Sequence, residues 1–171
     1  MARKGSRHLE NPFRHGRLSP VMRAIIESIG KVGSRASIDG HELIFDQPAT
    51  VPGGEDRGPS PLDVLSVSVA ACAHYFAAAY LHGRGVSPDG LAVEVTTEKE
   101  RVPVSRIGRL QMRVRLPVGL TERHIAGIER AIKSCPAYGT LLHPPSVEIS
   151  IATPGQTGVD GPADGRAAGV G

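Results

Sequence analysis

The stretch "SPLDVLSVSVAACAHYFAAAYLHG", residues 60–83, decides the fold of this chain. Asp63 is its only Asp, Glu, Lys or Arg, and apolar residues occur on all sides of the helix that it would form. Ser60 is a good N-cap residue, Pro61 suits the first helical turn, and Asp63 completes a motif similar to a capping box. We therefore expect a helix that begins at Pro61, ends near Gly83 and is buried on every side.

The same stretch approaches the length of a membrane span. Its serines, histidines and many alanines nevertheless make its hydrophobicity weak. We therefore expect a buried core helix of a soluble domain, and we expect no membrane partner.

The chain of 171 residues is long enough for one domain with a core, plus tails. We expect a basic mobile arm at 1–20, a single domain at 21–151 and a disordered glycine-rich tail at 152–171. The net charge is only +3, and most basic arms are simply solvated, so we expect no nucleic-acid partner. Two cysteines do not make a disulfide scaffold, and the charged N-terminus lacks an apolar signal region. Both features favour the cytoplasm.

Turn and capping signals divide the chain on the N-terminal side of the central helix. Ser19-Pro20 predicts the start of a helix over 21–30, because Ser caps helices and Pro suits their first turn. Asp39-Gly40 predicts a hairpin over 35–45. A loop rich in Gly and Pro follows and leads into the central helix.

Beyond the central helix, apolar and polar residues alternate at 91–98 and 110–116, which predicts two half-buried strands. A polar connection, 99–109, joins them. Thr121 caps a second helix with an isoleucine stripe, and 146–151 predicts a final strand. This order of elements predicts an α+β fold, with an antiparallel sheet and two long helices.

Cys72 and Cys135 are the two cysteines of the chain. Cys135 is ten residues after Ile125, in register with the apolar stripe of the second helix and at its C-terminal end, before Pro136. If the thiols work together, Cys72 is the attacking sulfur, because a helix C-terminus disfavours a thiolate at Cys135. The alternative is that both are inert buried residues. No zinc-like spacing joins Cys72 to nearby histidines, so we expect neither a metal nor another cofactor.

Three segments together resemble the OsmC/Ohr family of osmotically inducible and organic hydroperoxide resistance proteins. They are "GPSPLDVLSVSVAACAHYF" (58–76), "LHGRGVSPDGLAVEV" (81–95) and "AIKSCPAYGTLLHPPSVEISI" (131–151). The shared features are the helix-opening proline before Ala71-Cys72, the glycine- and proline-containing step into a strand, and Cys135-Pro136 some sixty residues later. The resemblance covers about residues 30–151.

The resemblance implies an intertwined homodimer with two active sites at the interface, and a thiol peroxidase acting on organic hydroperoxides. By the same resemblance, Cys72 would become a sulfenic acid and condense with Cys135 to a disulfide. A dithiol, often on a lipoyl-bearing protein in related enzymes, would then reduce that disulfide. The alternative is a non-catalytic member that binds a small apolar ligand or senses oxidants.

Peroxidase members of the family activate the cysteine with an arginine, which is oriented by a glutamate directly after the helix-opening proline. Here Leu62 follows that proline, and Asp63 is the nearest acid. Arg35 is our first choice for the arginine and Arg57 the second. Asp63 lies about 13 Å along the helix axis from Cys72. It would therefore have to hold a bridging arginine or serve a partner subunit's cysteine, and its alternative role is to cap the helix with Ser60.

Overall fold

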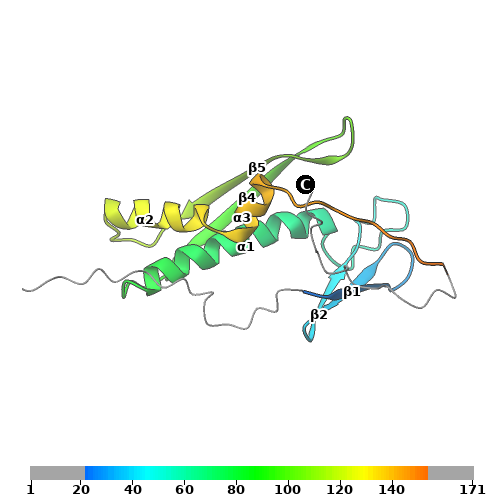
Figure 1. Ribbon diagram of the computed structural model, residues 1–171, viewed down its shortest axis with the longest axis horizontal. Helices are drawn as coiled ribbons and strands as arrows, with labels where there is room; N and C mark the ends of the chain where they lie inside the picture. The colour runs from blue at the N-terminus through cyan, green and yellow to red at the C-terminus, as the bar shows by residue number, and fades with distance from the viewer. Residues whose placement is uncertain (1–21, 154–171) are drawn as a thin grey trace, which may run out of the picture.

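The computed structural model describes residues 22–153, so the predicted arm at 1–20 and most of the predicted tail lie outside the described residues. The fold is α+β, as predicted, with three helices and two antiparallel sheets among these residues. Figure 1 shows that the N-terminal sheet stands apart from a larger body, which contains the helices and the second sheet.

The N-terminal sheet has the strand order β1-β2-β3, with β1 at Ala24–Ser28, β2 at Ser34–Ile38 and β3 at His41–Phe45. The helix predicted over 21–30 is therefore wrong. The β-branched pair Ile25 and Ile26 favours a strand, and the pairing of β1 with β2 outweighs the capping signal.

The predicted hairpin between β2 and β3 is confirmed. Asp39 and Gly40 have φ angles of 47° and 82°, and positive φ at both central residues is what a type I′ turn requires. Ser34 pairs with Phe45 at the open end of this hairpin.

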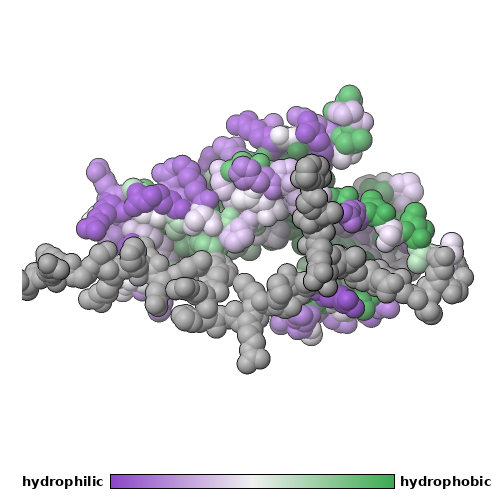
Figure 2. Space-filling model, viewed as in Figure 1, coloured by the Kyte–Doolittle hydropathy of each residue, from purple (hydrophilic) through white to green (hydrophobic). Residues whose placement is uncertain are grey.

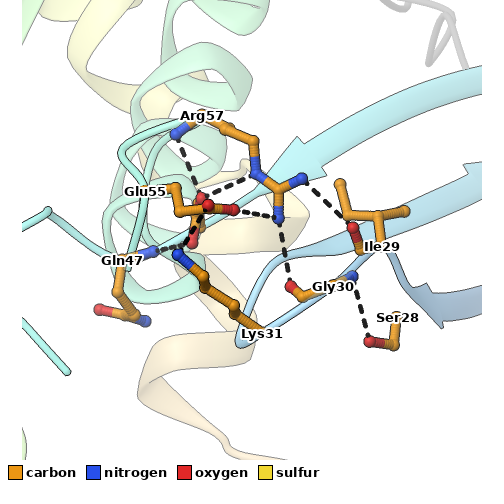
Figure 3. A network of polar contacts seen from close by, with 8 residues as sticks. Ser28, Ile29, Gly30, Lys31, Gln47, Glu55 and Arg57 are labelled. Carbon is orange, nitrogen blue, oxygen red and sulfur yellow. Dashed lines mark hydrogen bonds and ion pairs between the residues drawn. The ribbon is translucent and has the colours of Figure 1, made fainter. Parts of the chain in front are cut away.

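A buried ion pair fastens the loop after β3 to the turn between β1 and β2 (Figure 3). Asp46 is 1% exposed and accepts hydrogen bonds from the Gln47 backbone N–H at 2.8 Å and from Arg57 Nε at 3.2 Å. The guanidinium of Arg57 also donates to the carbonyls of Ile29 and Gly30, each at 3.2 Å. Arg57 thus connects segments almost thirty residues apart in the sequence.

The central helix α1 runs from Pro61 to His82, close to the predicted bounds. The Ser60 hydroxyl accepts a hydrogen bond from the Asp63 backbone N–H at 3.3 Å, as an N-cap residue does. One side of α1 packs against α2 and β4. The core cluster on this side contains Ala77 and Leu81 of α1 and Ile128 of α2.

The other side of α1 is uncovered within one chain, so the predicted burial on every side is wrong for a single subunit. Leu65, Val67 and Tyr75 on this side are 47%, 57% and 47% exposed. By length and composition alone, α1 could cross a membrane, but the core helix of a soluble protein meets the same criteria.

Strands β4, Ala92–Glu100, and β5, Arg106–Arg115, form a long antiparallel hairpin. Both extend further than predicted, so the expected polar connection shrinks to a tip at 101–105. Val93 pairs with Val114 on the face toward α1, while the opposite face carries cross-strand charges such as Glu98 and Arg109.

Helix α2, Glu122–Lys133, begins as predicted at Thr121, whose hydroxyl accepts a hydrogen bond from the His124 backbone N–H. A further short helix, α3 at Pro136–Leu142, was not predicted. The strand predicted at 146–151 is wrong for a single chain, because this segment pairs with no described strand. Its apolar side chains are almost fully exposed: Val147 80%, Ile149 85% and Ile151 88%.

The substitution Asp46→Asn is expected to destabilise the fold. Burial acts to raise the pKa of Asp46, but the hydrogen bonds from Gln47 and Arg57 and the charge of Arg57 outweigh it, so the pKa lies below its ordinary value of 3.8. The resulting stabilisation is fully present above this ordinary value and is lost as the pH falls through the lowered folded value. Thermal unfolding should show a lower midpoint for Asp46→Asn at neutral pH, and a shrinking difference from wild type in acid.

Glu129→Gln is the matched control, because it removes an exposed ion pair with Lys133. Exposed ion pairs contribute little to the free energy of unfolding. Its midpoint should change several times less than that of Asp46→Asn. Equal midpoints for the two variants at neutral pH would contradict a stabilising role for the Asp46–Arg57 pair.

Candidate active site

The structure brings Cys72 and Cys135 together. Cys72 lies at the middle of α1, half-buried, on the border between the packed side and the uncovered side. Cys135 is 1% exposed. It does not lie on a helix as predicted, because α2 ends at Lys133 and Cys135 is the N-cap residue of α3. Pro136 explains this, since its ring lacks the N–H that a continuous helix needs.

Burial and two neighbouring groups set the pKa of Cys72. Burial raises the pKa of the Cys72 thiol above its ordinary value of 9.0, and a hydrogen bond with the Cys135 side chain raises it further. The Ala137 backbone N–H acts in the opposite direction, but does not compensate. Among the described residues, no Lys or Arg lowers the pKa of Cys72. Within one chain the thiol is therefore protonated at neutral pH.

An aromatic pair lies one helical turn beyond Cys72. The rings of Tyr75 and Phe76 meet edge to face, with centroids 5.6 Å apart. Residues three and four positions along a helix flank the first residue, so these rings border the uncovered side of the cysteine. They give the surroundings of Cys72 an apolar, aromatic character.

Arg35 lies in β2 of the N-terminal sheet and faces solvent, with its Nε 3.9 Å from a carboxylate oxygen of Glu42. That sheet makes no extensive contact with α1 of the same chain. The structure therefore does not bring Arg35 to the cysteine pair within one subunit.

Arg57, the second choice for the activating arginine, is bound to groups other than the cysteines. Its Nε, both terminal nitrogens and its backbone N–H contact Asp46, Glu55 and two backbone carbonyls. To approach a cysteine, Arg57 would have to abandon the buried carboxylate of Asp46. These contacts assign it a structural task in the single chain.

Asp63 lies in the first turn of α1, beside the N-cap residue Ser60, and pairs with Lys99, a cation that the sequence did not reveal. Its Oδ2 accepts a hydrogen bond from the Ser60 hydroxyl at 2.6 Å, and its Oδ1 lies 3.7 Å from Lys99 Nζ. Lys99 lies in β4, and only the packing of the hairpin against α1 brings it there. No local sequence signal could have identified this pair.

An open apolar groove of about 350 Å³ lies between α1 and β4. It is lined by Val67, Ala70, Ala71, His74, Val93 and Val95. His74 lies about 200° around α1 from Cys72, so the groove is on a different side of the helix from the thiol. Among residues 22–153, no group of three or more His, Cys, Asp or Glu side chains is placed to hold a metal.

Mild oxidation is expected to form a disulfide between Cys72 and Cys135 without unfolding, because the Cys135 side chain lies near enough to Cys72 to affect the pKa of its thiol. Intact-mass analysis after diamide treatment should show the loss of two hydrogens from the single chain. Either Cys72→Ser or Cys135→Ser should prevent this loss. Oxidation of the wild type that yields only disulfides between chains would contradict this proximity.

Comparisons with known proteins agree with this fold. The family model described as OsmC-like protein matches residues 53–150, which include both cysteines. A search of the curated proteins finds no match. Several solved structures share the fold at low sequence identity.

One is an OsmC-like protein from Mycoplasma pneumoniae, 20% identical, with a TM-score of 0.59, covering 71% of this chain and 86% of that one. Another is an organic hydroperoxide resistance protein from Elizabethkingia anophelis, 17% identical, with a TM-score of 0.54 and coverage of 70% and 87%. A third is the organic hydroperoxide resistance protein OhrB of Bacillus subtilis, 17% identical, with a TM-score of 0.51 and coverage of 70% and 90%. The family match and the shared fold together show that this chain belongs to the OsmC-like protein family.

Proposed function

We propose that this chain is a thiol-dependent peroxidase that reduces organic hydroperoxides, with Cys72 as the attacking thiol and Cys135 as the resolving thiol. The observation that carries this proposal is that Cys135, the other cysteine of the chain, lies close enough to Cys72 for its side chain to raise the pKa of that thiol. The family and the names of related structures, which include organic hydroperoxide resistance proteins, support an oxidative stress role.

The proposed cycle has three steps. The Cys72 thiolate attacks the distal peroxide oxygen, the O–O bond breaks, and the products are a Cys72 sulfenic acid and an alkoxide, which takes up a proton and becomes an alcohol. Cys135 then attacks the Cys72 sulfur, which forms a disulfide and releases water. An external dithiol, such as that of a lipoyl-bearing protein, reduces the disulfide and becomes oxidised itself.

The first step needs a thiolate, and a single chain does not favour one. Burial raises the pKa of Cys72, so a nearby cation is required at neutral pH. We propose that a second copy of the chain supplies it in an intertwined homodimer. Arg35 is the preferred cation, and Asp63 would orient it across the interface.

Two features of the single chain support this assembly. The uncovered side of α1 is a large apolar surface, of a kind that marks protein interfaces. The segment 146–151 has the alternating pattern of a strand and no strand to pair with among the described residues. A second copy of the chain would cover the exposed side of α1 and could offer a strand to the segment 146–151.

We propose that this activity takes place in the cytoplasm. In the soluble OsmC-like fold α1 is a core helix, and a reducing compartment keeps both thiols available for catalysis.

The alternative is a non-catalytic OsmC-like protein that binds a small apolar ligand or senses oxidants. The raised pKa of Cys72 and the apolar groove at Val67 and Val95 favour it. The pH dependence of Cys72 alkylation separates the two functions. A pKa clearly below the ordinary value supports the peroxidase, and a pKa at or above it supports the alternative.

Cys72→Ser is expected to abolish the consumption of cumene hydroperoxide with a dithiol reductant, because the attacking sulfur is removed. Cys135→Ser should retain the first step and accumulate a Cys72 sulfenic acid, detectable as a dimedone adduct by mass spectrometry. Ser134→Ala is the control next to Cys135 and should keep most of the activity. Wild-type protein that consumes no more peroxide than Cys72→Ser would refute the proposed function.

Ala71→Glu is expected to disrupt the proposed dimer, because it places a charge on the uncovered apolar side of α1. Light scattering should give the mass of two chains for the wild type and of one chain for Ala71→Glu.

Ala126→Glu introduces the same change at an exposed position of α2 and should leave the mass unchanged. Circular dichroism checks that each variant keeps its helix content. A wild type with the mass of a single chain would contradict the assembly, whatever the variants do.

A further inference from the structure

The tip of the β4–β5 hairpin is an exposed apolar knob that the proposed chemistry does not use. Val102 and Val104 are 81% and 64% exposed and flank Pro103. Figure 1 shows this tip projecting well beyond α1 and the N-terminal sheet. In Figure 2 the same projection carries hydrophobic residues at its end, beside a hydrophilic region.

The antiparallel pairing of β4 with β5 supports this projecting tip, and exposed ion pairs lie beside it. Arg106 pairs with Glu100 at 2.7 Å across the last rung before the tip. Lys99 reaches Asp63 at the start of α1, which ties the outer part of the hairpin to the body. The tip is thus presented on a two-stranded support rather than on a long irregular loop.

The charge around the tip is positive. Residues 98–109 contain four Lys or Arg and two Glu. Glu98 and Glu100 are each paired with an arginine of β5, and Arg101 forms no ion pair with any described residue. The outermost turn, 101–105, therefore combines one unneutralised cation with the apolar side chains and contains no acid.

We propose that this tip docks on the surface of an anionic lipid bilayer. A convex apolar end beside a cation suits the boundary between lipid headgroups and acyl chains, which needs no complementary pocket. Three small side chains cannot supply the roughly 800 Å² per partner that a stable protein interface buries. The contact is peripheral and reversible and does not depend on the peroxidase chemistry. It departs from our sequence-based expectation of no membrane partner, which rested on α1 alone.

Sedimentation with lipid vesicles tests this inference on the full chain. The wild type should bind vesicles of equal parts phosphatidylcholine and phosphatidylglycerol, and bind pure phosphatidylcholine vesicles more weakly. The double variant Val102→Asp with Val104→Asp should lower the bound fraction about tenfold, because two apolar contacts are lost. Arg101→Glu should lower it about fivefold or more, because an attraction to anionic lipid becomes a repulsion.

Val118→Asp is the matched control, because Val118 is 99% exposed and lies in the turn at the opposite end of β5. It should bind like the wild type. A wild type that remains in the supernatant with both vesicle types overturns the inference, as does an equal loss of binding in Val118→Asp. If the double variant binds vesicles normally but changes the mass of the soluble assembly, the tip contacts a second copy instead, and the inference is wrong.

Discussion

The constraint on which the rest of this structure depends is a central helix that is apolar all round and that one chain can cover on only one side. The core cluster of Ala77, Leu81 and Ile128 buries the side toward α2. Leu65, Val67 and Tyr75 remain exposed on the other side. Fully burying a large apolar side chain contributes about 1.5–3 kcal/mol, so this uncovered surface is a strong driving force for association. The proposed homodimer would cover this side of α1.

The N-terminal sheet is also poorly covered by its own chain. It contacts the helices of its own chain only slightly, and the loop after β3 connects it to α1. The buried pair of Asp46 and Arg57 gives that loop a fixed shape, so the sheet projects in a defined direction. Gly33 permits this arrangement, because a Cβ there would collide with the guanidinium of Arg57. Arg57, the second choice for the catalytic arginine in the sequence analysis, thus links the loop to the turn between β1 and β2.

Local signals predicted the local structure well. The cap at Ser60, the turn at Asp39-Gly40 and the cap at Thr121 each depend on a few neighbouring residues, and each is confirmed. The failures at 21–30 and 146–151 both concern strands, whose existence depends on a distant partner.

The same distinction explains the candidate site. The cysteine pair was predictable because one thiol lies in a conspicuous apolar helix and the other in register with an apolar stripe. The resemblance to a known family then connected the two. The pairing of Asp63 with Lys99 was not predictable, because it depends on how the β4–β5 hairpin packs against α1.

Burial has opposite consequences for the two halves of the proposed chemistry. An apolar environment at Cys72 suits a hydrocarbon hydroperoxide and shelters a sulfenic acid from further oxidation, but it also raises the pKa of the thiol. The single chain offers no compensating cation among its described residues, since Arg57 is held by Asp46 and Arg35 lies on the separate sheet. The uncovered side of α1 adjoins Cys72, so a subunit that covers this surface would bring its own charges toward the thiol. Assembly and activation would then be one event, in which the same contact buries apolar surface and supplies the cation.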